Sequence, residues 1–175
     1  EKYKKMKKTI FLSTLAFFLA YLFYPNVINS NSSGSPGGKT GSPIDGVSCN
    51  ACHYAGNGNQ NNISITGIPA EYTPNEIYTI TATINQPGTN KFGFEITSEV
   101  GVPPGSKTGT FIITNSNETK LVNNNTSVTH KSSGNTGINN TKSWTFDWQA
   151  PNGIGSIVFY AAFLGTNEDG TNSGD

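Results

Sequence analysis

The chain of 175 residues contains no arginine, and all eleven of its basic side chains are lysines. Bidentate guanidinium clamps on phosphate or carboxylate groups are therefore excluded. Charged residues make up only 13% of the chain and the formal net charge is zero. We expect no nucleic-acid partner, because no basic field is available to attract one. Paired acids, a Ser/His/Asp order and phosphate-binding glycine loops are also missing, so we expect no enzyme.

Cysteine and methionine are equally scarce. Two cysteines are too few for the disulfide framework of a small secreted protein, and the single methionine is Met6. No stretch of ten residues shows helical periodicity, whereas 20 glycines and 9 prolines punctuate the chain. This composition favours short strands and turns over long helices.

The zero net charge is the sum of two unlike parts. The first eight residues carry five lysines and one glutamate, while the remainder carries six lysines and ten acids. The basic start is followed by an uncharged apolar run, Ile10–Tyr24, which is typical of a secretory signal. Residues 1–30 are therefore predicted to be a signal peptide or an N-terminal anchor. We expect the rest of the chain to be periplasmic, held at the cell surface or secreted.

The exported part divides into a linker and a domain. Residues 31–62 are rich in Gly, Pro, Ser and Asn, which predicts a linker that contains the cysteine site. From Ile63 onward apolar and polar residues alternate, as in Tyr78-Thr79-Ile80-Thr81-Ala82, and the pattern predicts half-buried strands. Residues 63–175 are predicted to form an all-β, antiparallel, Ig-like β-sandwich of about seven strands, preceded by a loop or short helix that carries the cysteines. Gly155–Leu164 is apolar on both faces and is expected to be a central strand. We also expect further sequence beyond Asp175.

The cysteines stand in the motif Cys49-Asn50-Ala51-Cys52-His53, the C-x-x-C-H spacing at which c-type haem is attached. On a helical turn these positions share one face. Cys49 and Cys52 would form the thioethers, His53 would be the proximal iron ligand, and Tyr54 would pack against the porphyrin. The motif therefore predicts one haem c, with its iron, per chain.

Other roles for this motif remain open. Cys49 and Cys52 form a disulfide in a second hypothesis, join His53 and His130 in a zinc site in a third, and are inert in a fourth. For a haem, the distal iron ligand is expected to be His130, with water, lysine, tyrosine or an open position as alternatives, because no methionine follows Met6.

Several segments resemble a known family. These are the Gly/Pro-rich lead into the motif (35–43), and then VTH (128–130), WTFDWQAP (144–151), GSIVFYAA (155–162) and SGD (173–175). Together they resemble the bacterial Reeler-like, "choice-of-anchor V" secreted domains. The resemblance implies an extracellular β-sandwich followed by a variable C-terminal region that associates with the cell surface. It also favours a site role for His130.

The leading hypothesis from the sequence is thus an exported monohaem c-type cytochrome domain for one-electron transfer or haem-based sensing, working with an unidentified redox partner or extracellular electron acceptor. The alternative is a non-catalytic extracellular adhesion or binding module, in which the Cys49–Cys52 pair is structural. A peroxidase with an open haem position is the third hypothesis.

Overall fold

The computed structural model describes residues 31–53, 62–101, 105–153 and 155–168, together with Tyr3, Ile10, 13–15 and 17–18 near the N-terminus. Within this described part of the chain, no helix is both long and apolar enough to cross a membrane.

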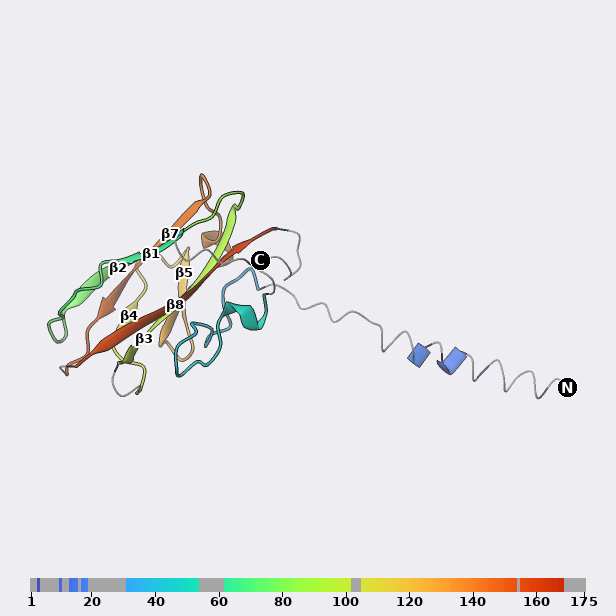
Figure 1. The fold of residues 1–175 in the computed structure, drawn as a ribbon, viewed down its shortest axis with the longest axis horizontal. Coiled ribbons are helices and arrows are strands. Elements are labelled where there is room, and N and C mark those ends of the chain that lie inside the picture. Colours follow the sequence, from blue (N-terminus) through green and yellow to red (C-terminus); the bar gives the residue numbers. More distant parts are fainter. Residues whose placement is uncertain are drawn as a thin grey trace.

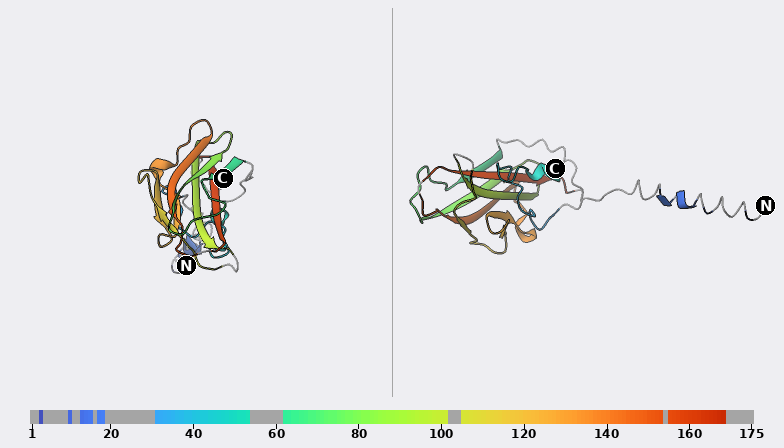
Figure 2. Two further views of the ribbon diagram at one scale, coloured as in Figure 1. Left: turned by 90° about the vertical axis from the view of Figure 1, so that its left-hand side faces the viewer. Right: turned by 90° about the horizontal axis from the view of Figure 1, so that it is seen from below.

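Two four-stranded antiparallel sheets face each other (Figures 1 and 2). The first sheet has the strand order β1-β2-β7-β4, and the second has the order β5-β6-β3-β8. The bounds are β1 Ile63–Thr66, β2 Ile77–Asn85, β3 Lys91–Val100, β4 Thr110–Ile112, β5 Thr119–Val122, β6 Ser127–His130, β7 Thr141–Gln149 and β8 Ile157–Thr166. Two short 3-10 helices, η1 (Cys49–Ala51) and η3 (Ser132–Gly134), complete the described elements. The predicted fold class is confirmed, with eight strands in place of about seven.

The core between the sheets follows from the period-two pattern. Trp144, Phe146 and Trp148 of β7 are at most 1% exposed, because alternate residues of a strand face the same side. The Trp144 ring stacks on Phe94 of β3 with centroids 4.3 Å apart. Trp148 donates a hydrogen bond from Nε1 to Ser98 Oγ at 3.0 Å, so its one polar atom is satisfied inside the core. The two sheets are thus joined mainly through aromatic side chains.

Strand β8 is not where the sequence pattern placed it. Its ten residues pair with β3 from Lys91↔Thr166 to Val100↔Ile157, yet β8 is the last strand of its sheet. Apolar residues on both faces of a strand show that both faces contact apolar neighbours, but they do not show that both edges are paired. The expectation of a central strand was therefore wrong.

Candidate functional site

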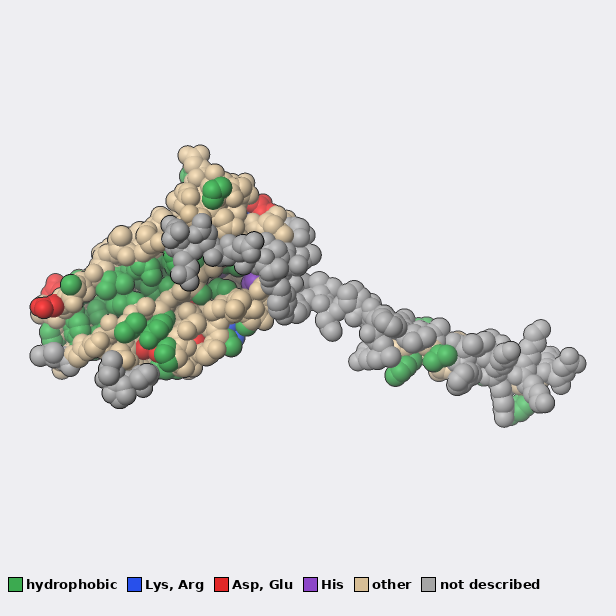
Figure 3. All heavy atoms as spheres, viewed as in Figure 1, with side chains coloured by type: hydrophobic (Ala, Val, Ile, Leu, Met, Phe, Trp, Pro, Cys, Tyr) green, Lys and Arg blue, Asp and Glu red, His purple; other side chains and the backbone are tan. Residues whose placement is uncertain are grey.

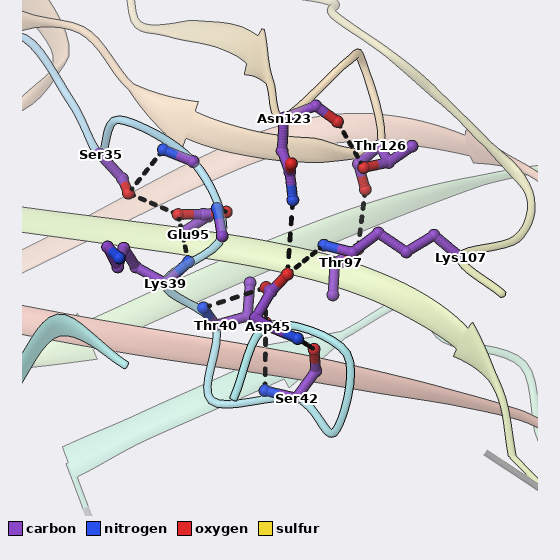
Figure 4. A network of polar contacts seen from close by, with 12 residues as sticks. Ser35, Lys39, Thr40, Ser42, Asp45, Glu95, Thr97, Lys107, Asn123 and Thr126 are labelled. Atoms are coloured by element: carbon purple, nitrogen blue, oxygen red, sulfur yellow. Dashed lines mark hydrogen bonds and ion pairs between the residues drawn. The ribbon is translucent and has the colours of Figure 1, made fainter. Parts of the chain in front are cut away.

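The outward face of β3 is covered by the segment Asn31–Ser48, which we call the strap. Glu95 lies at the centre of this contact and is fully buried. Its carboxylate accepts hydrogen bonds from Ser35 Oγ at 2.5 Å, Gly38 N–H at 2.8 Å and Lys39 N–H at 3.1 Å. Three donors on one carboxylate compensate for the cost of burying it. Glu95 therefore anchors the strap to the sheet (Figure 4).

A second contact holds the far end of the strap. Asp45 accepts hydrogen bonds from Lys107 Nζ at 2.6 Å and Thr40 Oγ1 at 2.5 Å, and also from Asn123 Nδ2 at 3.4 Å. Both partners of the ion pair are nearly buried, with 10% of the Lys107 side chain and 3% of the Asp45 side chain exposed. Burial raises the pKa of Asp45, but the hydrogen bonds from Lys107 and Thr40 outweigh it, so this pKa lies below the usual value. Asp45 is therefore a buried, paired anion (Figure 4).

The predicted cysteine site directly follows the strap. Cys49 begins η1, and its carbonyl accepts hydrogen bonds from the N–H groups of Cys52 and His53 at 3.2 and 3.1 Å. Cys52 is exposed and Cys49 is half-buried. Burial of the Cys49 thiol, together with the nearby negative charge of Glu95, raises its pKa to about 11. Cys49 is thus a protonated and weakly reactive thiol at neutral pH. Tyr54, the predicted haem-packing residue, lies outside the described residues.

His130 ends β6 and is only 8% exposed. Its Nδ1 accepts a hydrogen bond from the Phe94 backbone N–H at 3.2 Å. The ring covers Gly93, where an added Cβ would lie 2.7 Å from His130 Cε1. Burial lowers the pKa of His130 to about 4, so the imidazole is neutral at physiological pH. His130 therefore completes the pairing of β3 at a point where a backbone partner is lacking.

The sequence matches the Reeler domain family over residues 48–168, and this stretch includes all eight strands and the cysteine turn. The chain belongs to the Reeler domain family. Among solved structures, it is similar to the Reelin-N domain of F-spondin, with 20% identity over 67% of this chain and 82% of that one, and a TM-score of 0.53. It also aligns with the human F-spondin reeler domain (fragment 1), at 23% identity over 59% of this chain and 75% of that one, with a TM-score of 0.49. No curated protein matches it.

Membership of the Reeler family confirms the family resemblance seen in the sequence. Reeler domains are extracellular β-sandwich modules of the binding and adhesion type. This agrees with the alternative hypothesis from the sequence better than with the leading one. The "choice-of-anchor V" assignment and a bacterial source remain predictions.

The predicted haem cofactor is wrong. Reeler domains are not haem proteins, and within the described residues no group of three or more His, Cys, Asp or Glu side chains could hold a metal ion. The prediction rested on a five-residue motif alone, and in the structure this motif begins in the 3-10 turn η1 that follows the strap. The electron-transfer function, and the iron-ligand roles of His53 and His130, depended on that cofactor.

The residues that organise this region were missed by the sequence reasoning. Glu95, Asp45 and Lys107 were not singled out, since each stands in a sequence context typical of solvent-facing positions. One weak signal was present. The strap contains Ser35-Pro36-Gly37-Gly38, and Gly37 and Gly38 have φ of 98° and 71°, which side-chain-bearing residues rarely adopt. This conformation brings the Gly38 N–H to the Glu95 carboxylate.

Proposed function

We propose that this Reeler domain is a non-catalytic extracellular binding module, and that its binding surface is the outward face of the sheet β1-β2-β7-β4. The family supports the class of function. The surface itself is suggested by a ladder of hydroxyl groups across the sheet, and this observation carries the proposal.

The ladder runs along β2 and β7. Thr81 Oγ1 and Thr145 Oγ1 lie 3.2 Å apart, and Thr83 Oγ1 and Ser143 Oγ lie 2.8 Å apart. On the other side of β2, Thr81 pairs with Thr66 and Thr83 pairs with Ser64 of β1. Hydroxyl-bearing residues thus occupy the outward positions of three neighbouring strands in two successive rows.

The chemistry of this face favours an uncharged ligand rich in hydroxyl groups. A hydroxyl both donates and accepts hydrogen bonds, so a residue that bonds to its cross-strand neighbour still has capacity for a ligand. Asp147 is the only charged residue at the outward positions of the four strands, and it accepts a hydrogen bond from Thr79 Oγ1 at 2.7 Å. A neutral glycan matches both properties.

The proposal is tested by screening the purified protein against neutral and acidic glycans and measuring the affinity of any hit by calorimetry. Thr145→Glu places a charge in the middle of the ladder and is expected to weaken binding at least about tenfold. Ser116→Glu adds the same charge at an exposed loop position that is not part of the ladder and is expected to leave the affinity unchanged. Equal affinity of the two variants would remove the ladder from the binding surface.

We further propose that Cys49 and Cys52 are a structural pair that becomes oxidised outside the cell. The exposed Cys52 thiolate would attack a disulfide oxidant and release one oxidant thiol. Cys49, which is protonated at neutral pH, would then lose its proton and displace the second oxidant thiol in a slow second step, so that two thiols become one disulfide and the oxidant is reduced. Intact-mass analysis before and after alkylation tests this: protein from an oxidising compartment should take up no alkyl groups, and uptake of two would overturn it.

A further inference from the structure

Among the described strands, none pairs with one of the two edges of β8. Along its other edge it pairs with β3 through all ten residues without a break in register. At the free edge, no backbone hydrogen bond from any described residue reaches residues 157–166. Backbone N–H and C=O groups are therefore left ready to pair with a further strand.

The core of the sandwich reaches the surface beside this edge. On β3 the inward-facing side chains of Phe92, Phe94 and Ile96 are at most 2% exposed. On β8 the corresponding side chains, Ile157, Phe159, Ala161 and Phe163, are only partly buried. Figure 3 shows the result as an apolar strip on the face of the molecule where β8 lies. A strip of partly exposed, inward-facing apolar side chains is a feature of surfaces at which another molecule binds.

Within the strand itself, β8 carries none of the sequence features that usually keep an edge strand from pairing. Natural proteins protect such edges with lysine, proline, a bulge or a very short strand. From Gly155 to Thr166 there is no charged residue and no proline, and the regular register with β3 excludes a bulge. With ten residues, β8 is also as long as any strand in the molecule.

We propose that β8 is a dimerisation edge, at which the β8 strands of two copies of this chain pair antiparallel and join their second sheets into one. The charge pattern favours a second copy. An antiparallel pair of identical strands is self-complementary about a two-fold axis, and the uncharged β8 brings no like charges together. Each copy also supplies the apolar side chains that the other needs to cover its exposed core. The hydroxyl ladder lies on the other sheet, so this pairing is independent of the proposed binding surface.

Sedimentation velocity of the purified chain over a range of concentrations tests the proposal. The expected result is a monomer–dimer equilibrium. Tyr160→Lys combined with Leu164→Lys puts two charges on the outward face of β8, opposite the uncharged Thr97 and Gly93, and should weaken dimerisation at least about tenfold. Ile112→Lys combined with Ile138→Lys is the matched control, because both isoleucines are exposed and neither lies on β8. This control should dimerise like the parent.

Hydrogen exchange on the unsubstituted protein gives a second readout that does not depend on a variant that folds. The β8 amides that point away from β3 should exchange more slowly as the protein concentration rises. A monomer at all concentrations would overturn the proposal, as would a folded β8 variant that dimerises normally. Edge amides whose protection does not change with concentration would also overturn it, because a segment of the same chain would then cover the edge.

Discussion

The buried acids of β3 show how single residues define this molecule. Glu95 and Glu99 are four residues apart on the outward face of the strand, and both are at most 1% exposed. The Glu95 carboxylate has three donors from the strap, whereas both Glu99 oxygens have no hydrogen-bond partner in the described structure. Alternation along β3 would predict solvent-facing residues at both positions, and the sequence offers no sign that the strap covers them.

Replacing Glu95 should detach the strap. Glu95→Ala leaves Ser35 Oγ and the N–H groups of Gly38 and Lys39 without an acceptor, and the free energy of unfolding should fall by roughly 2–4 kcal/mol. Denaturant unfolding measures the loss, and hydrogen exchange at residues 35–40 shows whether the strap is released. Glu95→Gln keeps the shape and one acceptor oxygen and should cost less. Equal losses for the two variants would mean that the carboxylate does not anchor the strap.

His130 should make stability depend on pH. Its pKa falls from 6.5 to about 4 on folding because burial disfavours the charged ring. Below pH 6.5 the unfolded chain binds a proton at His130 that the folded protein does not bind. The free energy of unfolding is therefore highest above pH 6.5 and falls as the pH drops toward 4. The loss amounts to about 3 kcal/mol. Denaturant unfolding at several pH values between about 7.5 and 4 measures this loss of stability. In His130→Gln this part of the pH dependence should disappear, and a variant with the parent's full pH profile would contradict the assignment.

At the scale of elements, the sequence predicted strands well and their surroundings poorly. Alternation in β2 and β7 correctly identified their inward faces, with Ile80, Ala82, Trp144 and Phe146 in the core, because one buried face imposes a period of two. The strap was not predicted to pack, since its contacts come from backbone N–H groups, serine and threonine rather than from an apolar pattern. The edge position of β8 depends on pairings between distant segments, which periodicity does not encode.

The ion pair between the strap and the loop before β4 should stabilise the folded state. Lys107→Met leaves the Asp45 carboxylate buried without its cation, and we expect the free energy of unfolding to fall by roughly 3 kcal/mol. Combining Lys107→Met with Asp45→Asn removes that unpaired charge, so the double variant should lose less than the sum of the two single variants. Denaturant unfolding of all four proteins completes the cycle, and strict additivity would show that the two residues do not act as a pair.

At the scale of the whole molecule, the strap and the two proposed interaction surfaces lie on different parts of the sandwich. The strap covers the outward face of β3, and the hydroxyl ladder occupies the outward face of the other sheet. The free edge of β8 lies at the end of the second sheet, beside the core. Charge is distributed unevenly along the chain. Five lysines precede the apolar run, whereas the part from residue 31 onward carries six lysines and ten acids.

This charge distribution predicts how the protein responds to polyanions. A protein that binds a polyanion releases counterions, so its affinity falls steeply with salt. From residue 31 onward the net charge is −4, and no arginine is present to hold sulfate or phosphate groups. This part should pass through an anionic affinity column at low salt, whereas a chain that keeps residues 1–8 should be retained and then released as salt rises. Replacing Lys4, Lys5, Lys7 and Lys8 by serine in the longer chain should abolish retention. Salt-dependent retention of the part from residue 31 onward would instead reveal a basic surface made by the six remaining lysines, and an acidic glycan would then become the better candidate ligand.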